Sequence, residues 1–518
     1  MIKVIIKNSW ENVEPVREFT IYNNWDNLKQ EIEDIDLNEH KVLLEMEDNC
    51  WDGEYIGRSI IEPLLVFSNF TLQELTENKE YSNLLIFSHS KLKNESHLLD
   101  LPVFSHNIID KDIVRIKTGN VMGFIGARNV QVKIRSRFDS DEHDFFLHYL
   151  LEKVFHLNLV QLRYGNANVQ VLDFLYLMFP YFLKKAVKQG ILRQYVNKSC
   201  NDYSVKGTIN VPMHLRQNIP FMGKVAYTSH EYSTDNPLTQ LVRHTIEHIR
   251  NKLIGKHILY DGENRKAVRE IVSATPSYNA EERQKVIRIN SRPVAHPYYT
   301  AYEDLKKICL QILTHNKMSY KDGKPTINGI LFDGAWLWEE YVATILPDFK
   351  HPRNDIRDGG IRMFDEPAKE SEDIVTNSNR KIYPDFYKKE GDKMQYILDA
   401  KYKRQNEKGI YREDLYQVIA YMYTTECKWG GYIYPCQKNE NDTPYRCYQL
   451  AGYGGMVSSV PVLIPPHNEE YSQDQKSIDE AYQRFREQMG IVEDGIREAF
   501  CKWKFYEKSL ILNPEALK

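Results

Sequence analysis

Two aspartates and a lysine occupy positions from which they could hydrolyse a phosphodiester bond. Asp385 follows Pro384, and Asp399 and Lys401 stand on either side of Ala400. Carboxylates hold hard divalent cations, so we expect Mg²⁺, with Mn²⁺ as an alternative, bound by Asp385, Asp399 and the backbone carbonyl of Ala400. Such a cation would polarise the phosphate and lower the pKa of a bound water. Lys401 would orient or deprotonate that water and offset the charge of the transition state.

A β-hairpin is the element that would bring these side chains together. Residues 381–387 and 394–402 have the composition of two strands, and the polar residues between them are typical of a turn. Alternate side chains of a strand share a face, so Asp399 and Lys401 would project together. A surface salt bridge would explain that pair, but not the presence of Asp385 at the matching place on the other strand. The arrangement resembles the PD-(D/E)xK nuclease signature.

The helix predicted after the hairpin carries a second pair of polar residues. Gln417 and Tyr421 lie one helical turn apart, so they share a face. A Q-x-x-x-Y pattern after the DxK strand resembles the nucleases related to the RecB nuclease domain. That resemblance implies that both side chains belong to the active site. Residues 430–435 then have the composition of a buried strand.

A helix predicted over residues 331–342 would complete this core. In the fold that the signature implies, such a helix commonly donates a further acidic residue. We choose Glu339 over its neighbour Glu340 for that role. The order helix, hairpin, helix and strand predicts a C-terminal α/β core of the PD-(D/E)xK type.

Residues 119–126 are rich in glycine and superficially suggest a phosphate-binding loop. No Lys-Ser or Lys-Thr pair follows them, and the pattern GxxxxGK[ST] occurs nowhere in the chain. We therefore expect a turn between β-strands here, and no nucleotide bound by this chain itself.

A zinc-like pattern, H-x-x-E-H, is formed by His244, Glu247 and His248. Two histidines one turn apart with an adjacent glutamate can bind zinc. The pattern fixes only three residues, and no distant further ligand can be identified. The polar flank of an amphipathic helix is the simpler interpretation.

The composition is that of a folded protein. Of the 518 residues, 42% are hydrophobic and 27% are charged, which excludes fibrous and mostly disordered chains. The formal net charge is −4, yet residues 1–100 hold 9 Lys and Arg against 20 Asp and Glu, a net charge of −11, and the remaining residues carry +7. Because acidic surfaces repel phosphates, we expect any nucleic acid to be bound by the later part of the chain.

The cysteines and the apolar runs indicate in which cellular compartment the protein is found. Seven cysteines without a CxxC pair, and no visible secretory signal, predict a reducing, cytoplasmic environment. The most apolar run, residues 174–183, is ten residues long. A membrane-spanning helix needs about 18–20 such residues. We therefore expect a soluble protein without a membrane span.

The full set of motifs resembles the McrC family, the nuclease subunits of McrBC modification-dependent restriction systems. The stretches LWEEYV, PDF, ILDAKYK, DLYQVIAYMY and GGYIYP occur in the family's order and spacing. Residues 205–210 resemble the family's KGRI segment, and residues 232–238 resemble its D-N-x-L-x-N helix start, although Gln240 stands near where the family often has Asn. The resemblance covers residues 112–460.

The resemblance implies a DNA endonuclease subunit that has no nucleotide site and works with a ring of an McrB-like AAA+ GTPase. Part of the region before the nuclease would insert into that ring and stimulate GTP hydrolysis, with Lys206 and Arg216 as candidate contacts. Double-stranded DNA would be cut near 5-methylcytosine sites that the partner recognises.

These inferences together predict an α+β protein of several domains. Residues 1–110 would form an acidic α+β extension, and residues 111–325 a β-turn segment with a hairpin, followed by a mainly helical region that binds the partner. Residues 326–465 would form the nuclease domain, and residues 466–518 a helical tail.

Two other functions remain open from the sequence. The chain could be a non-catalytic activator or scaffold of the AAA+ motor, although an intact set of Asp385, Asp399 and Lys401 argues against this. It could also be a stand-alone RecB-like DNA exonuclease, although the long region before the nuclease fits partner binding better.

Overall fold

The computed structural model describes most of the chain: residues 2–7, 17–21, 41–49, 54–78, 84–88, 102–127, 130–139, 144–155, 171–252, 255–260, 262–291, 298–314, 320–321, 324–325, 327–352, 360–363, 381–404, 411–437, 446–452, 454–466 and 475–501. The chain divides into two compact units. Unit 1 consists of residues 1–169 and 324–518, and unit 2 of residues 170–323.

A seven-stranded sheet is the largest element of unit 1. Its strand order is β2-β1-β3-β9-β8-β15-β5, with β3–β9 and β15–β5 parallel and the other neighbours antiparallel. The strands are β1 (Ile2–Lys7), β2 (Arg17–Ile21), β3 (Lys41–Glu47), β5 (Leu84–Phe87), β8 (Val121–Ala127), β9 (Val130–Arg135) and β15 (Ile327–Asp333). Segments far apart in the chain therefore share one sheet.

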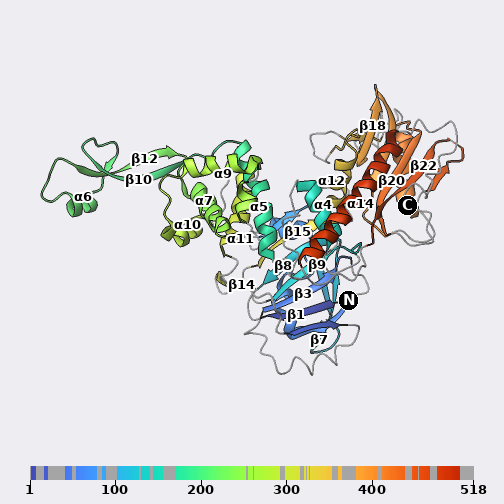
Figure 1. The fold of residues 1–518 in the computed structure, drawn as a ribbon, viewed down its shortest axis with the longest axis horizontal. Helices are drawn as coiled ribbons and strands as arrows, with labels where there is room; N and C mark the ends of the chain where they lie inside the picture. Colours follow the sequence, from blue (N-terminus) through green and yellow to red (C-terminus); the bar gives the residue numbers. More distant parts are fainter. Residues whose placement is uncertain are drawn as a thin grey trace, which may run out of the picture. The chain divides into compact units, whose positions relative to one another are not determined.

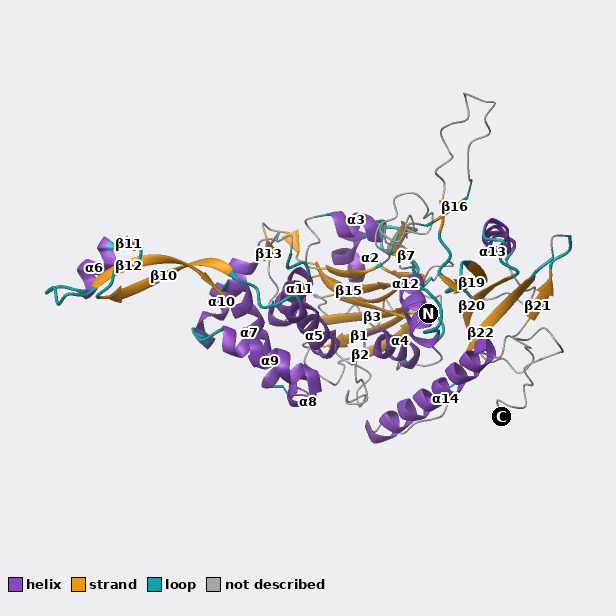
Figure 2. Ribbon diagram, turned by 90° about the horizontal axis from the view of Figure 1, so that it is seen from above, coloured by secondary structure: helices purple, strands orange, loops and turns teal. Residues whose placement is uncertain are grey.

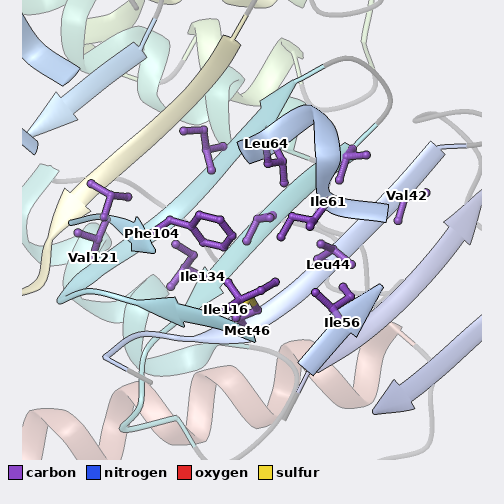
Figure 3. Close-up of a cluster of buried hydrophobic side chains, with 14 of the residues drawn as sticks. Val42, Leu44, Met46, Ile56, Ile61, Leu64, Phe104, Ile116, Val121 and Ile134 are labelled. Atoms are coloured by element: carbon purple, nitrogen blue, oxygen red, sulfur yellow. The ribbon is translucent and has the colours of Figure 1, made fainter. Parts of the chain in front are cut away.

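A three-stranded sheet and short helices pack with this large sheet. The order is β4-β7-β6, and the elements are β4 (Glu54–Gly57), α2 (Arg58–Ile61), η1 (Glu62–Phe67), α3 (Leu72–Glu77), β6 (Phe104–Ile108) and β7 (Ile113–Thr118). Leu44 and Ile134 of the large sheet pack with Ile56 and Ile116 of the small one in a single hydrophobic core (Figure 3). Burial of these side chains fixes the two sheets against each other.

A five-stranded sheet forms the C-terminal part of unit 1, in the order β18-β19-β20-β22-β21. Its inner strands β19, β20 and β22 are parallel, and β18 and β21 are antiparallel to their neighbours. The strands are β18 (Phe386–Glu390), β19 (Lys393–Ala400), β20 (Trp429–Gln437), β21 (Arg446–Gln449) and β22 (Met456–Ile464). A two-stranded pair, β16 (Ile361–Arg362) and β17 (Lys381–Ile382), precedes it in the chain.

Helices pack on this sheet: α12 (Gly334–Ile345), α13 (Arg412–Thr424) and α14 (Gln475–Cys501). Another helix, α4 (Phe145–Phe155), packs on α12 and α14. Figure 2 shows α13 and α14 on opposite sides of the sheet. The close approach of α13 depends on Gly430 of β20, because a Cβ there would lie 2.5 Å from the Met422 sulfur and 2.6 Å from a Val418 methyl group.

Unit 2 is a group of packed helices. They are α5 (Val171–Lys188), α7 (Pro237–Arg250), α8 (Gly255–Tyr260), α9 (Gly262–Ala274), η4 (Ala280–Glu282), α10 (Arg283–Asn290) and α11 (Ala301–Thr314). The apolar run at residues 174–183 lies in α5, and Leu175, Phe179 and Leu183 are buried in the core of the unit. Within the described residues, no helix has the length and apolar character that crossing a membrane requires. The strands β13 (Tyr320–Lys321) and β14 (Lys324–Pro325) have two residues each.

A long hairpin interrupts the helices of unit 2, and we call residues 194–233 the arm. It contains β10 (Gln194–Asp202), β11 (Thr208–Ile209), α6 (Val211–Gln217) and β12 (Val225–Ser233). Strands β10 and β12 pair along their whole lengths, and β11 adds a short third strand. Figure 1 shows the arm projecting away from the helices of its own unit.

The structure confirms the expected mixture of helices and sheets in more than one unit, but it divides the chain differently from our prediction. We predicted boundaries at residues 110, 325 and 465. Instead, β3 pairs with β9 and with β1, so these N-terminal strands share a sheet with strands that lie beyond residue 110. The middle unit also begins later, at residue 170.

The predicted helix over residues 331–342 is wrong at its start. Leu331, Phe332 and Asp333 are the last residues of β15, and α12 begins at Gly334. The Asp333 carboxylate accepts a hydrogen bond from the Ala335 backbone N–H at 2.9 Å, which is the reason the helix begins there.

Candidate active site

The hairpin of β18 and β19 places Asp385 beside Asp399. Phe386 pairs with Leu398, so the residue before β18 lies next to the end of β19. Pro384 has no N–H to donate, which is consistent with the break between β17 and β18 at this point. The Ala400 backbone N–H donates to Asp385 Oδ2 at 2.8 Å and fixes that carboxylate.

A third carboxylate comes from α12. Glu339 is buried, with 7% of its surface exposed, whereas the carboxylate of Glu340 lies 4.0 Å from the His351 ring. Burial, together with the negative charges of Glu339 and Asp399, raises the pKa of Asp385 well above its usual value. The charges of Glu339 and Asp399 therefore both act on Asp385.

Lys401 is held as a positive charge among these groups. Its Nζ lies 2.5 Å from Asp399 Oδ2, and it donates to Gln417 Oε1 at 2.8 Å. Burial opposes the charge, but the carboxylates of Asp399 and Asp385 outweigh it, so the pKa of Lys401 is raised. Of the two roles that we expected for Lys401, this environment favours orienting water and balancing charge over removing a proton.

Gln417 and Tyr421 link Lys401, which follows β19, to the segment that precedes β18. The Gln417 side-chain amide donates to the Tyr421 hydroxyl at 2.7 Å, and that hydroxyl donates to the Tyr383 carbonyl at 3.4 Å. A chain of contacts thus runs from Lys401 through α13 to the residue before Pro384. The structure therefore brings together all six side chains that we singled out for this site.

The chemistry of this donor set fits Mg²⁺, which prefers oxygen ligands. Within the residues that the structure describes, no three His, Cys, Asp or Glu side chains are already gathered as a cation site. Lys401 Nζ instead contacts the Asp399 carboxylate, and burial, together with the negative charges of Glu339 and Asp399, raises the pKa of Asp385. A divalent cation would supply the missing positive charge, with Asp385 and Asp399 as the side chains that would hold it.

Sequence reasoning missed two residues that hold the end of β19. The Arg137 guanidinium donates to the Tyr402 carbonyl at 3.0 Å and lies 4.6 Å from the centre of the Tyr402 ring. Asp48 lies 3.5 Å from the same guanidinium and accepts from the Arg137 backbone N–H at 2.6 Å. Because Tyr402 follows Lys401, these contacts tie the large sheet to the strand that carries the site. Arg137 and Tyr402 are 265 positions apart in the chain, so no local sequence pattern indicates that they are in contact.

Asp414 is a third residue that the sequence did not reveal. It is buried in the first turn of α13, and its Oδ1 accepts from Lys403 Nζ at 2.9 Å and lies 3.9 Å from Lys401 Nζ. The acidic residues in the first turn of α13 could have indicated a carboxylate near the site.

The residues of the H-x-x-E-H pattern have other partners. Glu247 forms ion pairs with Arg243 at 2.8 Å and Arg250 at 2.7 Å, and the His248 ring lies 3.2 Å from the Tyr176 hydroxyl. His244 is buried against Tyr278, and burial lowers its pKa. Glu247 and His248 are therefore engaged in contacts with other side chains, whereas His244 lies on the buried side of α7 and not on its polar flank.

The arm is a second candidate site. Its outer part exposes large apolar side chains that a protein in water normally buries: Tyr203 (73%), Ile209 (52%), Val211 (56%), Leu215 (55%), Ile219 (68%), Phe221 (62%) and Met222 (78%). The shape of this part is nevertheless fixed, because the side chains of Asn201 and Asn218 hydrogen-bond to each other twice, at 3.1 and 2.9 Å. Lys206 and Arg216 are both exposed here.

Glu493 of α14 positions α12, the helix that carries Glu339. It is buried, with 1% exposed, and its carboxylate oxygens accept from four side chains. These are Tyr149 (2.7 Å), Lys153 (2.8 Å), Tyr341 (3.0 Å) and Arg497 (3.1 Å). Three helices, α4, α12 and α14, therefore meet at one carboxylate.

We expect Glu493→Ala to lower the free energy of unfolding of unit 1 by about 3 kcal/mol, because buried donors would lose their acceptor. Thermal and urea unfolding measure this loss. Asp494→Ala is the matched control, since the Asp494 side chain is 74% exposed and one position away. If both variants change the free energy of unfolding by the same small amount, Glu493 does not hold the helices together.

The comparisons with known proteins point to one family. Residues 116–435 match the model of the McrBC 5-methylcytosine restriction system component, a segment that contains both the arm and the candidate active site. No curated protein matches the chain.

Two solved structures from Thermococcus gammatolerans are similar to it. One is a refined half-complex of McrB AAA+ hexamers with bound McrC, at 14% identity and a TM-score of 0.42, covering 85% of this chain and 99% of that one. The other is a cryo-EM structure of the McrBC complex, at 14% identity and a TM-score of 0.30, covering 59% of this chain and 87% of that one. Since the family model matches more than half of its residues, this chain belongs to the family of McrBC 5-methylcytosine restriction system components.

Proposed function

We propose that this chain is the DNA endonuclease subunit of a modification-dependent restriction complex and that it hydrolyses phosphodiester bonds with Mg²⁺. The observation that carries the proposal is the meeting of Asp385, Asp399 and Lys401 at one end of β19, with Glu339 beside them. This arrangement lies inside the segment that matches a restriction-system family.

Each side chain has a role that its contacts suggest. When bound, the cation would polarise the phosphate and acidify a water molecule. Asp385 and Asp399 would hold it, and the Ala400 N–H keeps Asp385 in place. Lys401 would orient the attacking water and offset the negative charge of the transition state, while Gln417 fixes the ammonium.

We further propose that the arm binds an AAA+ GTPase ring of the McrB type. The exposed apolar side chains of the arm form a surface that a partner would cover, and the paired asparagines give it a fixed shape. The chain has no GxxxxGK[ST] pattern, so nucleotide hydrolysis would belong to the partner.

We expect the double substitution Phe221→Ser and Met222→Ser to weaken partner binding by about 10-fold or more, because large apolar side chains dominate such interfaces. Affinity for the ring and stimulation of its GTP turnover would both be measured. Ile108→Ser is the control, since Ile108 is 57% exposed but lies on β6 of unit 1. Unchanged binding of the double variant would place the partner surface elsewhere.

Closed circular DNA distinguishes this function from the two alternatives. With the partner, GTP and Mg²⁺, an endonuclease converts a methylated closed circle into linear DNA. An exonuclease leaves the circle intact because it needs an end, and a non-catalytic activator leaves both circles and linear DNA intact. Intact circles under these conditions would contradict the proposal.

A further inference from the structure

Exposed aromatic and basic side chains lie together at the start of α13, beside the candidate active site. We call Lys403, Tyr411, Arg412 and Tyr416 the α13 cluster. Tyr411 and Tyr416 are 37% and 54% exposed, and the Lys403 side chain is 42% exposed.

Each ring of the cluster is paired with a cation. The Arg412 guanidinium lies 5.2 Å from the centre of the Tyr416 ring, and its Nε donates to the Tyr416 hydroxyl at 2.7 Å. Lys403 Nζ lies 5.8 Å from the centre of the Tyr411 ring. The ion pairs found among the described residues do not include Arg412, so its charge is available to an anion.

The cluster is continuous with the residues that would cut DNA. Tyr416 precedes Gln417, which accepts from Lys401, and Lys403 shares the Asp414 carboxylate with Lys401. Lys403 of the cluster therefore lies close to Lys401, where the phosphate of a bound strand would lie. Glu413 is also exposed on this turn, so simple charge attraction is not the main feature of the surface.

We propose that the α13 cluster binds the DNA strand next to the cut phosphate by stacking with unpaired bases, and this rests on the proposed nuclease function. Aromatic rings and guanidinium planes stack on the faces of bases, and neighbouring cations contact the phosphates. The faces of bases are accessible only where the strand is unstacked. The cluster therefore prefers a locally unpaired strand to an intact duplex.

The test measures binding of the full chain to fluorescent oligonucleotides in EDTA, so that it does not depend on cleavage. The Tyr416→Ala and Arg412→Ala variants should each weaken binding to single-stranded oligothymidine by about 10-fold, the effect of losing one stacking platform. The Tyr416→Phe variant keeps the ring and should bind nearly as tightly as wild type. Tyr448→Ala is the control, since Tyr448 is 43% exposed on β21.

Duplex of the same length should lose much less affinity than the single strand in both alanine variants. Unchanged binding to single strands, or equal losses for single strands and duplex, would overturn the proposal. The readout is binding and not cleavage, so the two proposals can fail separately. If the alanine variants lose affinity mainly for single strands but the wild-type chain never cuts DNA, the nuclease function is contradicted and the stacking surface is still supported.

Discussion

Asp399→Asn is expected to reduce DNA cleavage by about 10³-fold or more, because a neutral amide cannot replace a charged cation ligand. Asp399 is 1% exposed at the end of β19, where its carboxylate lies 2.5 Å from Lys401 Nζ and acts on Asp385. Asparagine has nearly the same shape, and the variant should keep the fold, as circular dichroism would verify.

The control for this variant is Asp392→Asn in the exposed turn of the same hairpin. It removes the same charge from the same pair of strands without touching the site. Cleavage should stay at the wild-type rate in the control. If both variants cut DNA equally well, the carboxylate of Asp399 has no role in catalysis.

Lys401→Arg should lower the cleavage rate by about 10²-fold, the scale of losing a positioned polar group in a transition state. Arginine keeps the charge, but its planar guanidinium cannot occupy the position of a compact ammonium that contacts Asp399 and Gln417 at once. Single-turnover cleavage with excess protein measures the chemical step.

The matched control is Lys393→Arg, at the exposed start of the same strand. Its rate should equal that of wild type. A Lys401→Arg chain with normal turnover would show that this lysine only neutralises a carboxylate in the fold.

The geometry of the site was predictable because its determinants are local. Asp385 directly precedes β18 and Asp399 lies near the end of β19, and the pairing of these two strands, which a short turn joins, brings the two carboxylates together. Gln417 and Tyr421 are one helical turn apart, and a helix places them on one face. The positions of these side chains can therefore be predicted from the local sequence without knowing the rest of the fold.

The support around the site was not predictable, because it depends on segments far apart in the chain. Arg137 contacts Tyr402 across 265 positions, and Glu493 contacts Tyr341 across 152. The same reason explains why the sequence did not reveal the parallel pairing of residues 42–47 with residues 130–135, whose sequences carry no mutual signal. Leu331 was assigned to a helix because short apolar runs do not distinguish strands from helices.

The most direct test measures cutting and GTP turnover together in the reconstituted complex. The Asp399→Asn chain and the Phe221→Ser, Met222→Ser chain are each mixed with an McrB-type ring, methylated closed circular DNA, GTP and Mg²⁺. We predict that the Asp399→Asn complex hydrolyses GTP at the wild-type rate and leaves the DNA intact, whereas the arm variant loses both activities. DNA cutting at the wild-type rate by the Asp399→Asn complex would contradict the account, because the cutting site would then lie outside this hairpin.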